Sequence, residues 1–391
     1  MIKKTKIAVY SGEVPSTTFI ERLINGLCDE GYSVLLFGNL KKKTHYKSSR
    51  ASVITYSDNR LQKLYHLIKY SVLLGLFRKR EKKHLDAIIC EKNANTILSK
   101  LRYYPVLWHK PDVFHLQWAR SIGDWIWVRD FGMKLIVSLR GVHINYTPIT
   151  QPEIGLLYQR VFHKVDGFHA VSQAIAKEAM KYGADAEKIK VVYSGLDKID
   201  LPNKKTEEPT VFTILSVGRA HWVKGYTYAL EACKILKDSG FVFKYQIIGG
   251  KDSEELCYLV ETFNLQKEVA LLGNTSFVEV QEKMQYANVL LLPSVEEGIA
   301  NVILEAMQLG TLVISTDCGG MDEVIVNGQN GFLIPIRDSQ NMAESLLKIF
   351  QFSLEEKQRM IERAKTTIDD QHSKERMISD IIALYENVLE R

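Results

Sequence analysis

The sequence predicts an α/β protein made of two doubly wound domains that face a cleft. Short runs of Val, Ile and Leu alternate with helical stretches almost throughout the chain, which is typical of parallel sheets covered by helices. The length of 391 residues is sufficient for two domains. A polar stretch at 197–209 contains two prolines and no periodicity, as expected of a linker. The predicted domains are 1–200 and 210–372, followed by a last helical segment at 373–391.

The first domain begins with a short apolar strand that ends in Ser11-Gly12-Glu13, before a helix from about Thr18. A turn of this type faces a ligand at the carboxyl edge of an open sheet. We expect strands at Lys6–Ser11, Ser33–Phe37, Ser52–Tyr56, Val113–Gln117, Lys134–Leu139, Gly167–Val171 and Ile189–Tyr193. Helices are expected at 18–30, 61–83, 92–102, 152–164 and 173–182.

The second domain repeats this alternation, so both domains are expected to be Rossmann-like. Its predicted strands are Phe212–Val217, Tyr245–Ile248, Val269–Leu272, Val289–Leu292, Leu312–Ser315 and Phe332–Ile334. One helix is expected at Asn301–Leu309, stopped by Gly310, and three more near 338–350, 354–368 and 373–390.

The most informative stretch of the sequence runs from Glu297 to Glu305, between two buried strands. Eight residues on a continuous helix would turn the two carboxylates about 80° apart, so one shared helical face does not explain the pair. We therefore place Glu297 on a loop and Glu305 inside the helix, with the helix N-terminus between them. Such an N-terminus suits a phosphate. Two acidic acceptors beside it could bind hydroxyl groups on either side of a diphosphate, as in a nucleotide-sugar.

Two basic residues fall in the first strand-to-helix loop of the second domain. Arg219 follows the strand that ends at Val217, and Lys224 precedes the next helix. Loops at the carboxyl ends of parallel strands are where ligands bind, and these two cations could neutralise a diphosphate leaving group. The alternative is that both are simply solvated. Other strand ends carry Gly249-Gly250, Gly273-Asn274 and Gly319-Gly320, followed by Glu323, which could also be an ordinary first-turn acid.

Composition excludes several classes of protein. No apolar stretch reaches the length of about 18 residues that a membrane-spanning helix needs, and the N-terminus does not resemble a signal peptide. The expected location is the cytoplasm, with the inner face of the plasma membrane as a second option. The five cysteines have no CxxC spacing and are expected to be reduced. No His, Cys and Asp cluster predicts a metal site.

Positive charge is concentrated in one segment at 60–83, which also contains an apolar stretch at 70–77. Basic residues flanking apolar ones can rest on an anionic membrane. The alternative is a solvated helix that packs one apolar face on its own domain, and both interpretations stay open. Nucleic acid is not an expected partner, because nothing else in the sequence resembles a nucleic-acid-reading element.

With these residues in place, the second half resembles the nucleotide-sugar domain of retaining glycosyltransferase family 4, an enzyme group with the GT-B fold. The matching segments occur in the family's order over about 110 residues: Ser216–Arg219, Lys224-Gly225, Pro293-Ser294, Glu297-Gly298, Asn301-Val302, Glu305–Met307, Gly310, Gly319-Gly320 and Glu323. In the first half, Val14–Ile20 is similar to the opening loop of the branch that builds colanic acid and related surface polysaccharides. By this resemblance, the last helix, which contains Tyr385, packs back on the first domain.

The resemblance implies roles for these residues. Arg219 and Lys224 would bind the donor diphosphate, Glu297 the transferred sugar and Glu305 the nucleotide ribose. The donor would be a UDP- or GDP-linked sugar, with no cofactor and no metal. The expected donor-binding set is Gly12, Arg219, Lys224, Gly273, Glu297, Gly298, Ile299, Ala300, Asn301 and Glu305.

The sequence departs from the family at two positions. Many members have a histidine followed by glycine after the strand equivalent to 134–139, whereas this chain has Arg140-Gly141. Either His143 or His115 takes part of that role, or Arg140 binds the sugar or the acceptor differently. Arg140 and His143 are therefore included with Glu297, Arg219 and Lys224 as candidate catalytic residues. The other departure is Thr17, where the polysaccharide branch often has glutamate.

The leading hypothesis is transfer of a sugar to a glycan or a lipid-linked glycan, with retention at the anomeric carbon and without a metal. One alternative is a nucleotide-sugar epimerase of the same fold, which would need carboxylates near the sugar. The strand ends at 113–117 and 134–139 are poor in acids, which argues against it. The other alternative is a non-catalytic scaffold of a polysaccharide assembly complex.

Overall fold

The computed structural model describes residues 5–92, 96–198 and 210–391, which form two compact units. The first unit comprises Met1–Val171, Ala176–Val192 and Lys374–Arg391. The second comprises Ser172–Ile175 and Tyr193–Ser373. The residues predicted as a linker lie largely in 199–209, outside the described residues.

The first unit is built on a parallel sheet of seven strands in the order β3-β2-β1-β4-β5-β6-β7. Each of the seven predicted strands is present, because buried β-branched and leucine-rich runs suit a sheet covered on both faces. Their bounds are β1 Lys6–Val14, β2 Ser33–Leu40, β3 Ala51–Tyr56, β4 Val113–Leu116, β5 Lys134–Leu139, β6 Gly167–Ala170 and β7 Ile189–Val191.

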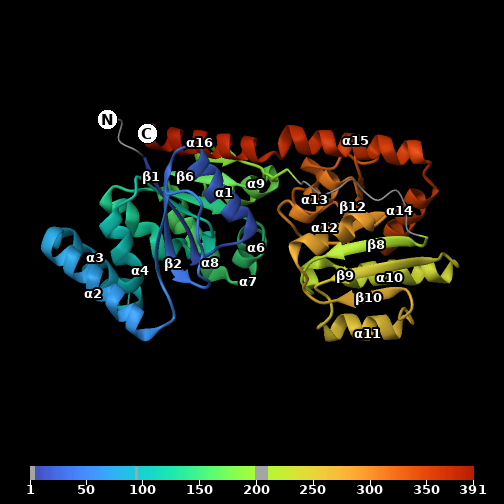
Figure 1. Cartoon of the computed structure of the whole chain (residues 1–391), viewed down its shortest axis with the longest axis horizontal. Coiled ribbons are helices and arrows are strands. Elements are labelled where there is room, and N and C mark those ends of the chain that lie inside the picture. Colours follow the sequence, from blue (N-terminus) through green and yellow to red (C-terminus); the bar gives the residue numbers. More distant parts are fainter. Residues whose placement is uncertain (1–4, 93–95, 199–209) are drawn as a thin grey trace. The chain divides into compact units, whose positions relative to one another are not determined.

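Helices cover this sheet, and the last helix of the chain belongs to the same unit. The helices are α1 Thr18–Asp29, α2 Arg60–Phe77, α3 Lys79–Glu91, α4 Thr96–His109, α5 Ile122–Trp125, α6 Val142–Asn145, α7 Thr147–Thr150, α8 Pro152–Val161, α9 Gln173–Met180 and α16 Lys374–Glu390. Figure 1 shows α16 beside α1. The apolar side chains of α16 share one core with α1, β1, β2 and β4.

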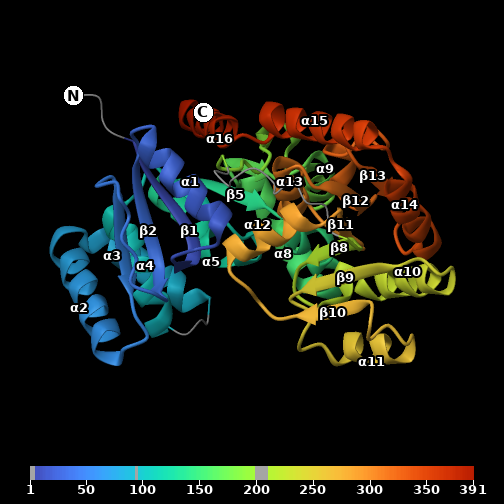
Figure 2. The ribbon, with the colours of Figure 1, turned by 45° about the vertical axis from the view of Figure 1, so that its right-hand side comes forward.

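The second unit contains a parallel sheet of six strands in the order β10-β9-β8-β11-β12-β13. The strands are β8 Phe212–Val217, β9 Phe243–Ile248, β10 Val269–Leu272, β11 Val289–Leu292, β12 Leu312–Thr316 and β13 Phe332–Ile334. The helices are α10 Tyr226–Asp238, α11 Glu254–Thr262, α12 Phe277–Tyr286, α13 Asn301–Leu309, α14 Ser339–Gln351 and α15 Leu354–Gln371. One apolar core contains side chains of α10 and α14, and another contains those of α12 and α13. Figure 2 labels these four helices around the second sheet.

Both sheets have the doubly wound order, so the predicted fold class is confirmed. In each sheet the chain first adds strands on one side and then returns to add strands on the other. The reversal falls between β1 and β4 in the first unit and between β8 and β11 in the second. Ligands of such sheets bind at this switch point, beyond the carboxyl ends of the strands.

Two details of the first unit differ from the prediction. The helix expected at 61–83 is two helices, α2 and α3, separated at Arg78. Arg78 leaves the helical conformation, with φ of −139°, and its guanidinium donates to the carbonyl of Leu107 at 2.9 Å. This long-range anchor has no Gly or Pro signal in the sequence. Strand β1 also continues past the expected turn at Ser11–Glu13 to Val14, with an irregular register between Val9 and Gly12.

Candidate functional site

The strongest candidate site of the second unit lies at the switch point of its sheet. Strands β8, β11 and β12 are neighbours and parallel, so the loops that follow them meet at one edge. These loops are 218–225, 293–300 and 317–320. They contain most of the residues that the sequence predicted for donor binding.

Backbone contacts hold the three loops together. The amide of Val295 donates to the carbonyl of Val223 at 2.7 Å, and the amide of Gly320 donates to that of Gly298 at 2.8 Å. Gly225 has φ of +64°, and a Cβ there would overlap the carbonyl of Pro293. Gly319 has φ of +59°, and a Cβ there would overlap the carbonyl of Glu297. Glycine is required at both positions because of the left-handed conformation and the close backbone approach.

These contacts bring Lys224 and Glu297 together, although 73 residues separate them in the sequence. The Nζ atom of Lys224 lies 2.5 Å from Oε1 of Glu297, and both side chains are largely buried. The same carboxylate oxygen accepts a hydrogen bond of 2.9 Å from the hydroxyl of Ser294. Burial strengthens charge-assisted bonds of this kind. The result is an ordered charged pair at the edge where this fold class binds its ligands.

Helix α13 begins beside this pair and has the features of an anion site. Its N-cap residue is Ala300, so no side chain caps the helix, and its first amide groups are oriented as donors. The amide of Ala300 donates to the sulfur of Met321 at 3.5 Å, and Oδ1 of Asn301 is buried without a partner among the described residues. Glu305 is buried within α13. Glu297 thus lies on the loop and Glu305 in the helix, on either side of the helix start.

Two further predicted donor residues, Arg219 and Gly273, also follow strands of this sheet. Arg219 follows β8 and is exposed; no carboxylate within the described ranges forms an ion pair with it. Gly273 follows β10, the edge strand, which β9 separates from β8. The intervening strand end is near the site, since a Cβ on Gly249 would lie 2.6 Å from the carbonyl oxygen of Gly218.

Glu323 already has partners within the second unit. Its carboxylate accepts hydrogen bonds from the amides of Gln173 and Ala174, at 2.8 and 2.9 Å, and from the hydroxyl of Tyr193 at 3.0 Å. Glu323 therefore accepts from the backbone amides of Gln173 and Ala174, and it does not cap its own short helical turn.

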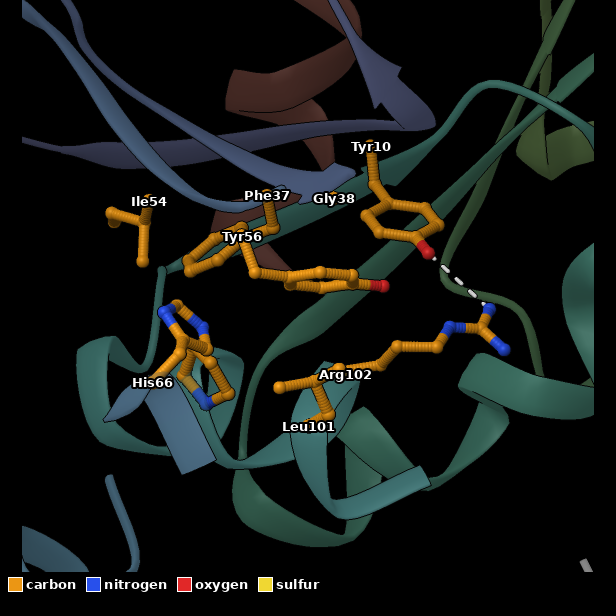
Figure 3. A pocket seen from close by; sticks show the side chains of 9 residues that line it. Tyr10, Phe37, Gly38, Ile54, Tyr56, His66, Leu101 and Arg102 are labelled. Atoms are coloured by element: carbon orange, nitrogen blue, oxygen red, sulfur yellow. Dashed lines mark hydrogen bonds between the residues drawn. The ribbon is translucent and has the colours of Figure 1, made fainter. Parts of the chain in front are cut away.

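The first unit contains a pocket of about 540 Å³ at the switch point of its own sheet. The wall is formed by the end of β1, which includes Gly12, by the loop that follows β1, and by Tyr56, Arg102 and Trp118. A narrower pocket shares Tyr10, Tyr56 and Arg102 with it (Figure 3). Aromatic rings combined with a few polar groups are typical of small-molecule sites.

Arg102 is held in a fixed position in this pocket. Its guanidinium donates to the hydroxyl of Tyr10 at 3.2 Å, as Figure 3 shows, and lies 3.1 Å from the carboxylate of Asp124. Burial, the largest effect, raises the pKa of Tyr10, so its hydroxyl remains protonated. Our sequence reasoning missed these residues. Tyr56 ends β3 and Trp118 follows β4. Both could have been found by the expectation, used for the second domain, that ligands bind at the carboxyl ends of parallel strands. Tyr10 lies within β1. Arg102 has no such signal.

Arg140 and His143 lie beside Trp118 of this pocket. The Cζ atom of Arg140 is 4.4 Å from the ring centroid of Phe19, which contacts Trp118 at 6.1 Å, and His143 contacts Trp118 at 5.5 Å. The Nη2 atom of Arg140 donates to the side-chain oxygen of Gln117 at 3.1 Å.

Arg140 and His143 each have a buried polar atom that forms no hydrogen bond with the described residues. Nε of Arg140 and Nδ1 of His143 are buried without a hydrogen-bond partner, and no described carboxylate forms an ion pair with Arg140. Burial lowers the pKa of Arg140 to about 9, so it is a cation at neutral pH without an acidic partner. Burial, and then the charge of Arg120, lowers the pKa of His143, so that imidazole is neutral at pH 7.

His115, the other histidine considered from the sequence, has a structural environment. It is fully buried, and its ring nitrogens contact the hydroxyls of Tyr385 at 2.7 Å and Ser138 at 2.9 Å. Desolvation holds its pKa well below the ordinary value. With both nitrogens occupied inside the core, His115 cannot replace the family histidine.

Two features are absent from the described part of the chain. No helix there is long and apolar enough to span a membrane. Among the same residues, no three His, Cys, Asp or Glu side chains are grouped in a way that could hold a metal ion.

Two doubly wound units, with a charged pair at the switch point of one sheet, are typical of GT-B glycosyltransferases. The family model for glycosyl transferases group 1 matches residues 197–367, and the model for glycosyltransferase family 4 matches residues 16–198. The chain belongs to glycosyltransferase family 4, as the sequence motifs predicted.

Similar proteins agree with this assignment. The putative colanic acid biosynthesis glycosyltransferase WcaL of Escherichia coli is 27% identical over 379 residues, which are 90% of this chain and 92% of WcaL. The amylovoran biosynthesis glycosyltransferase AmsK of Erwinia amylovora is 33% identical over 203 residues, half of each chain. Among solved structures, sucrose-phosphate synthase from Thermosynechococcus elongatus has a TM-score of 0.75 at 16% identity, with 99% of both chains covered.

Proposed function

We propose that the chain is a retaining glycosyltransferase of surface polysaccharide biosynthesis. It would move a sugar from a nucleoside-diphosphate sugar to a glycan or lipid-linked glycan. The names of two relatives support the pathway class, since WcaL and AmsK are named for colanic acid and amylovoran biosynthesis. The retaining mechanism rests on the resemblance to family 4.

The single observation that carries the donor assignment is the Lys224–Glu297 pair beside the uncapped start of α13. In the proposed complex, Lys224 and Arg219 bind the diphosphate together with the amides of α13. Glu297 binds the transferred sugar, and Glu305 binds the ribose. A structure of Anabaena HepE with UDP and glucose has the same fold, with a TM-score of 0.72 at 16% identity and coverage of 98% of this chain and 99% of HepE. A UDP- or GDP-linked donor is therefore proposed.

The proposed reaction needs no metal. As the bond between the sugar and the diphosphate breaks, negative charge grows on the leaving phosphate. Two cations and the positive end of a helix dipole, fixed before the reaction, stabilise that charge. The departing phosphate itself can accept the proton of the acceptor hydroxyl.

The acceptor is proposed to bind in the aromatic pocket of the first unit. Trp118 and Tyr56 offer flat apolar surfaces for the faces of sugar rings, and Arg102 and the β1 loop offer hydrogen-bonding groups. We assign Arg140 as a cation for a phosphate of donor or acceptor, because its guanidinium lacks an acidic partner. His143 is assigned as a neutral hydrogen-bonding group near the reacting sugar. The proposed location is the cytoplasmic face of the plasma membrane.

Calorimetric titration of the protein with UDP and with GDP tests the donor site. The wild type should bind one of the two nucleotides. Lys224→Ala and Glu305→Ala should weaken that binding at least about tenfold, since each removes a charge-assisted bond. Lys234→Ala is the matched control, because Lys234 forms an exposed ion pair with Asp238 on α10 and should bind as the wild type does. Unchanged affinity in both site variants would refute the assignment.

A further inference from the structure

Helix α2 presents large apolar side chains on two opposite faces. His66, Tyr70 and Leu74 recur every four residues and are buried. A second set recurs every three or four residues, and its exposed fractions range from 50% to 76%. With 3.6 residues per turn, this second set lies on the face opposite the buried residues. It consists of Leu61, Leu64, Tyr65, Ile68, Val72 and Leu76, and we refer to it as the α2 outer face.

The buried face of α2 is explained by the first unit itself. The rings of His66 and Tyr56 have centroids 5.7 Å apart, and the hydroxyl of Tyr70 lies 3.2 Å from Nε2 of His109. A helix that only packs one apolar face on its own domain would be polar on the other. The α2 outer face therefore requires a separate explanation.

The α2 outer face has no cover within the described residues. In Figures 1 and 2, α2 lies at the edge of the first unit, with α3 and α4 on one side and no other drawn helix or strand over its outer side. Single exposed apolar residues are ordinary, but a contiguous exposed row marks an interaction surface.

Charge identifies the kind of surface that would cover it. The segment 60–83 holds eight basic residues and one acidic residue, a net charge of +7. The whole chain carries +5, so the remaining residues sum to −2. Lys69, Arg80 and Lys83 are exposed and form no ion pair with a described carboxylate. Lys69 lies on α2, and Arg80 and Lys83 lie on α3, which follows it in the chain. An exposed apolar row in a segment with unpaired cations fits a lipid bilayer, whose interior is apolar and whose surface can be anionic.

We infer that the α2 outer face seats the first unit on an anionic lipid bilayer. The helix would lie in the plane of the interface, with Leu64, Ile68 and Val72 among the upper acyl chains and the basic residues at the lipid phosphates. A second copy of this chain is disfavoured as the partner. A two-fold interface would place two segments of +7 against each other.

The position of α2 on a bilayer also bears on which class of acceptor the protein uses. This step rests on the proposed function. His66 lies on the inner face of α2 and lines the narrower pocket with Tyr10 and Arg102 (Figure 3). Seating α2 on the bilayer would bring that pocket within about one helix diameter, 10–12 Å, of the lipid surface. An acceptor anchored in the membrane by a lipid could then reach the pocket, which favours the lipid-linked glycan over a free one.

Vesicle sedimentation tests the inference on the full-length protein. Vesicles of phosphatidylcholine alone are compared with vesicles containing phosphatidylglycerol. The wild type should bind the anionic vesicles, and the bound fraction should fall as salt is raised. The triple variant Leu64→Gln, Ile68→Gln, Val72→Gln should bind at least about tenfold more weakly. The variant Lys69→Gln, Arg80→Gln, Lys83→Gln should lose binding to a similar extent.

The control is Val242→Gln with Leu354→Gln, which removes two apolar side chains of the second unit that are 71% and 72% exposed. It should bind as the wild type does. The inference is overturned if the wild type does not bind anionic vesicles, or if the α2 triple variant binds them as strongly as the wild type does. It is also overturned if analytical ultracentrifugation shows a dimer that this triple variant dissociates. Nucleotide calorimetry on the triple variant should match the wild type, so failure of membrane binding and failure of the donor site remain distinguishable.

Discussion

The ammonium of Lys224 lies 2.5 Å from the carboxylate of Glu297, and the hydroxyl of Ser294 lies 2.9 Å from the same oxygen. The residue proposed to bind the diphosphate and the residue proposed to bind the sugar thus hold each other in place. Each largely buried charge is compensated by the other, so the pair stabilises its loops as well as serving the donor.

The Lys224–Glu297 pair should show clear energetic coupling. In a double-mutant cycle with Lys224→Met and Glu297→Gln, each single change leaves the other group without its partner in a largely buried position. The expected coupling in unfolding free energy is about 1–3 kcal/mol. The exposed pair of Lys234 and Asp238 is the control, with an expected coupling below about 0.5 kcal/mol. Urea unfolding measures both cycles, and equal coupling in the two pairs would contradict the prediction.

Gly319 should not tolerate a side chain. In Gly319→Ala the new Cβ would overlap the carbonyl of Glu297. The alanine would also have to adopt the left-handed φ of +59°. We expect the 293–300 loop to shift, with transfer activity falling about 100-fold. Gly328→Ala is the matched control, since Gly328 has φ of +74° and open space around it. It should cost only about 1 kcal/mol of stability and retain activity. Activity near the wild-type level in Gly319→Ala would show that the loop position is not critical.

Arg140 should matter for activity more than for stability. Arg140→Gln removes a partly buried cation that no described carboxylate neutralises, so the free energy of unfolding should stay the same or rise. If Arg140 binds a phosphate of donor or acceptor, kcat/KM should fall about 100-fold. Arg129→Gln breaks an ion pair with Asp166 at 2.9 Å and serves as the control, with lower stability and normal kcat/KM. The reverse pattern, a stability loss without an activity loss in Arg140→Gln, would make Arg140 structural.

The first unit should lose stability in mild acid. Burial lowers the pKa of His66 and of His109 to about 4 and that of His169 to about 3. The unfolded chain binds these protons near pH 6.5, whereas the folded unit does not bind them until about pH 4 or below. Unfolding is therefore favoured as pH falls from about 6.5 to 4, with stability fully present above that range.

Tryptophan fluorescence can follow this acid effect, because four of the five tryptophans, Trp108, Trp118, Trp125 and Trp127, lie in the first unit. The urea midpoint should fall between pH 7.5 and pH 5. His66→Phe should reduce the pH dependence, and a midpoint that does not change with pH would contradict the role of these histidines.

Much of the fold was predictable because the buried strands are short, apolar and regularly spaced. Helix α13 was predicted at its observed bounds, Asn301–Leu309, since Gly310 stops it with φ of +78°. The break between α2 and α3 was not predictable. It depends on Arg78 reaching the carbonyl of Leu107 on α4, a contact made only after folding.

The candidate site was predictable only in part. Lys224 and Glu297 were each found because ligands bind in the loops at the carboxyl ends of parallel strands. Their contact depends on close backbone approaches at Gly225 and Gly319, which the sequence alone does not specify. The same rule could have found Trp118 and Tyr56. Arg102 could not be found this way, because it lies within α4 and reaches the pocket through tertiary packing with Tyr10. The structural environment of His115 likewise depends on Tyr385, 270 residues away.

The most direct test of glycosyl transfer is to follow the anomeric sugar signal by nuclear magnetic resonance while the protein acts on a UDP- or GDP-sugar with a lipid-linked glycan. We predict nucleotide release that requires the acceptor, and a product with the anomeric configuration of the donor. Conversion of the nucleotide-sugar without an acceptor would indicate an epimerase, and an inverted product would contradict the retaining mechanism.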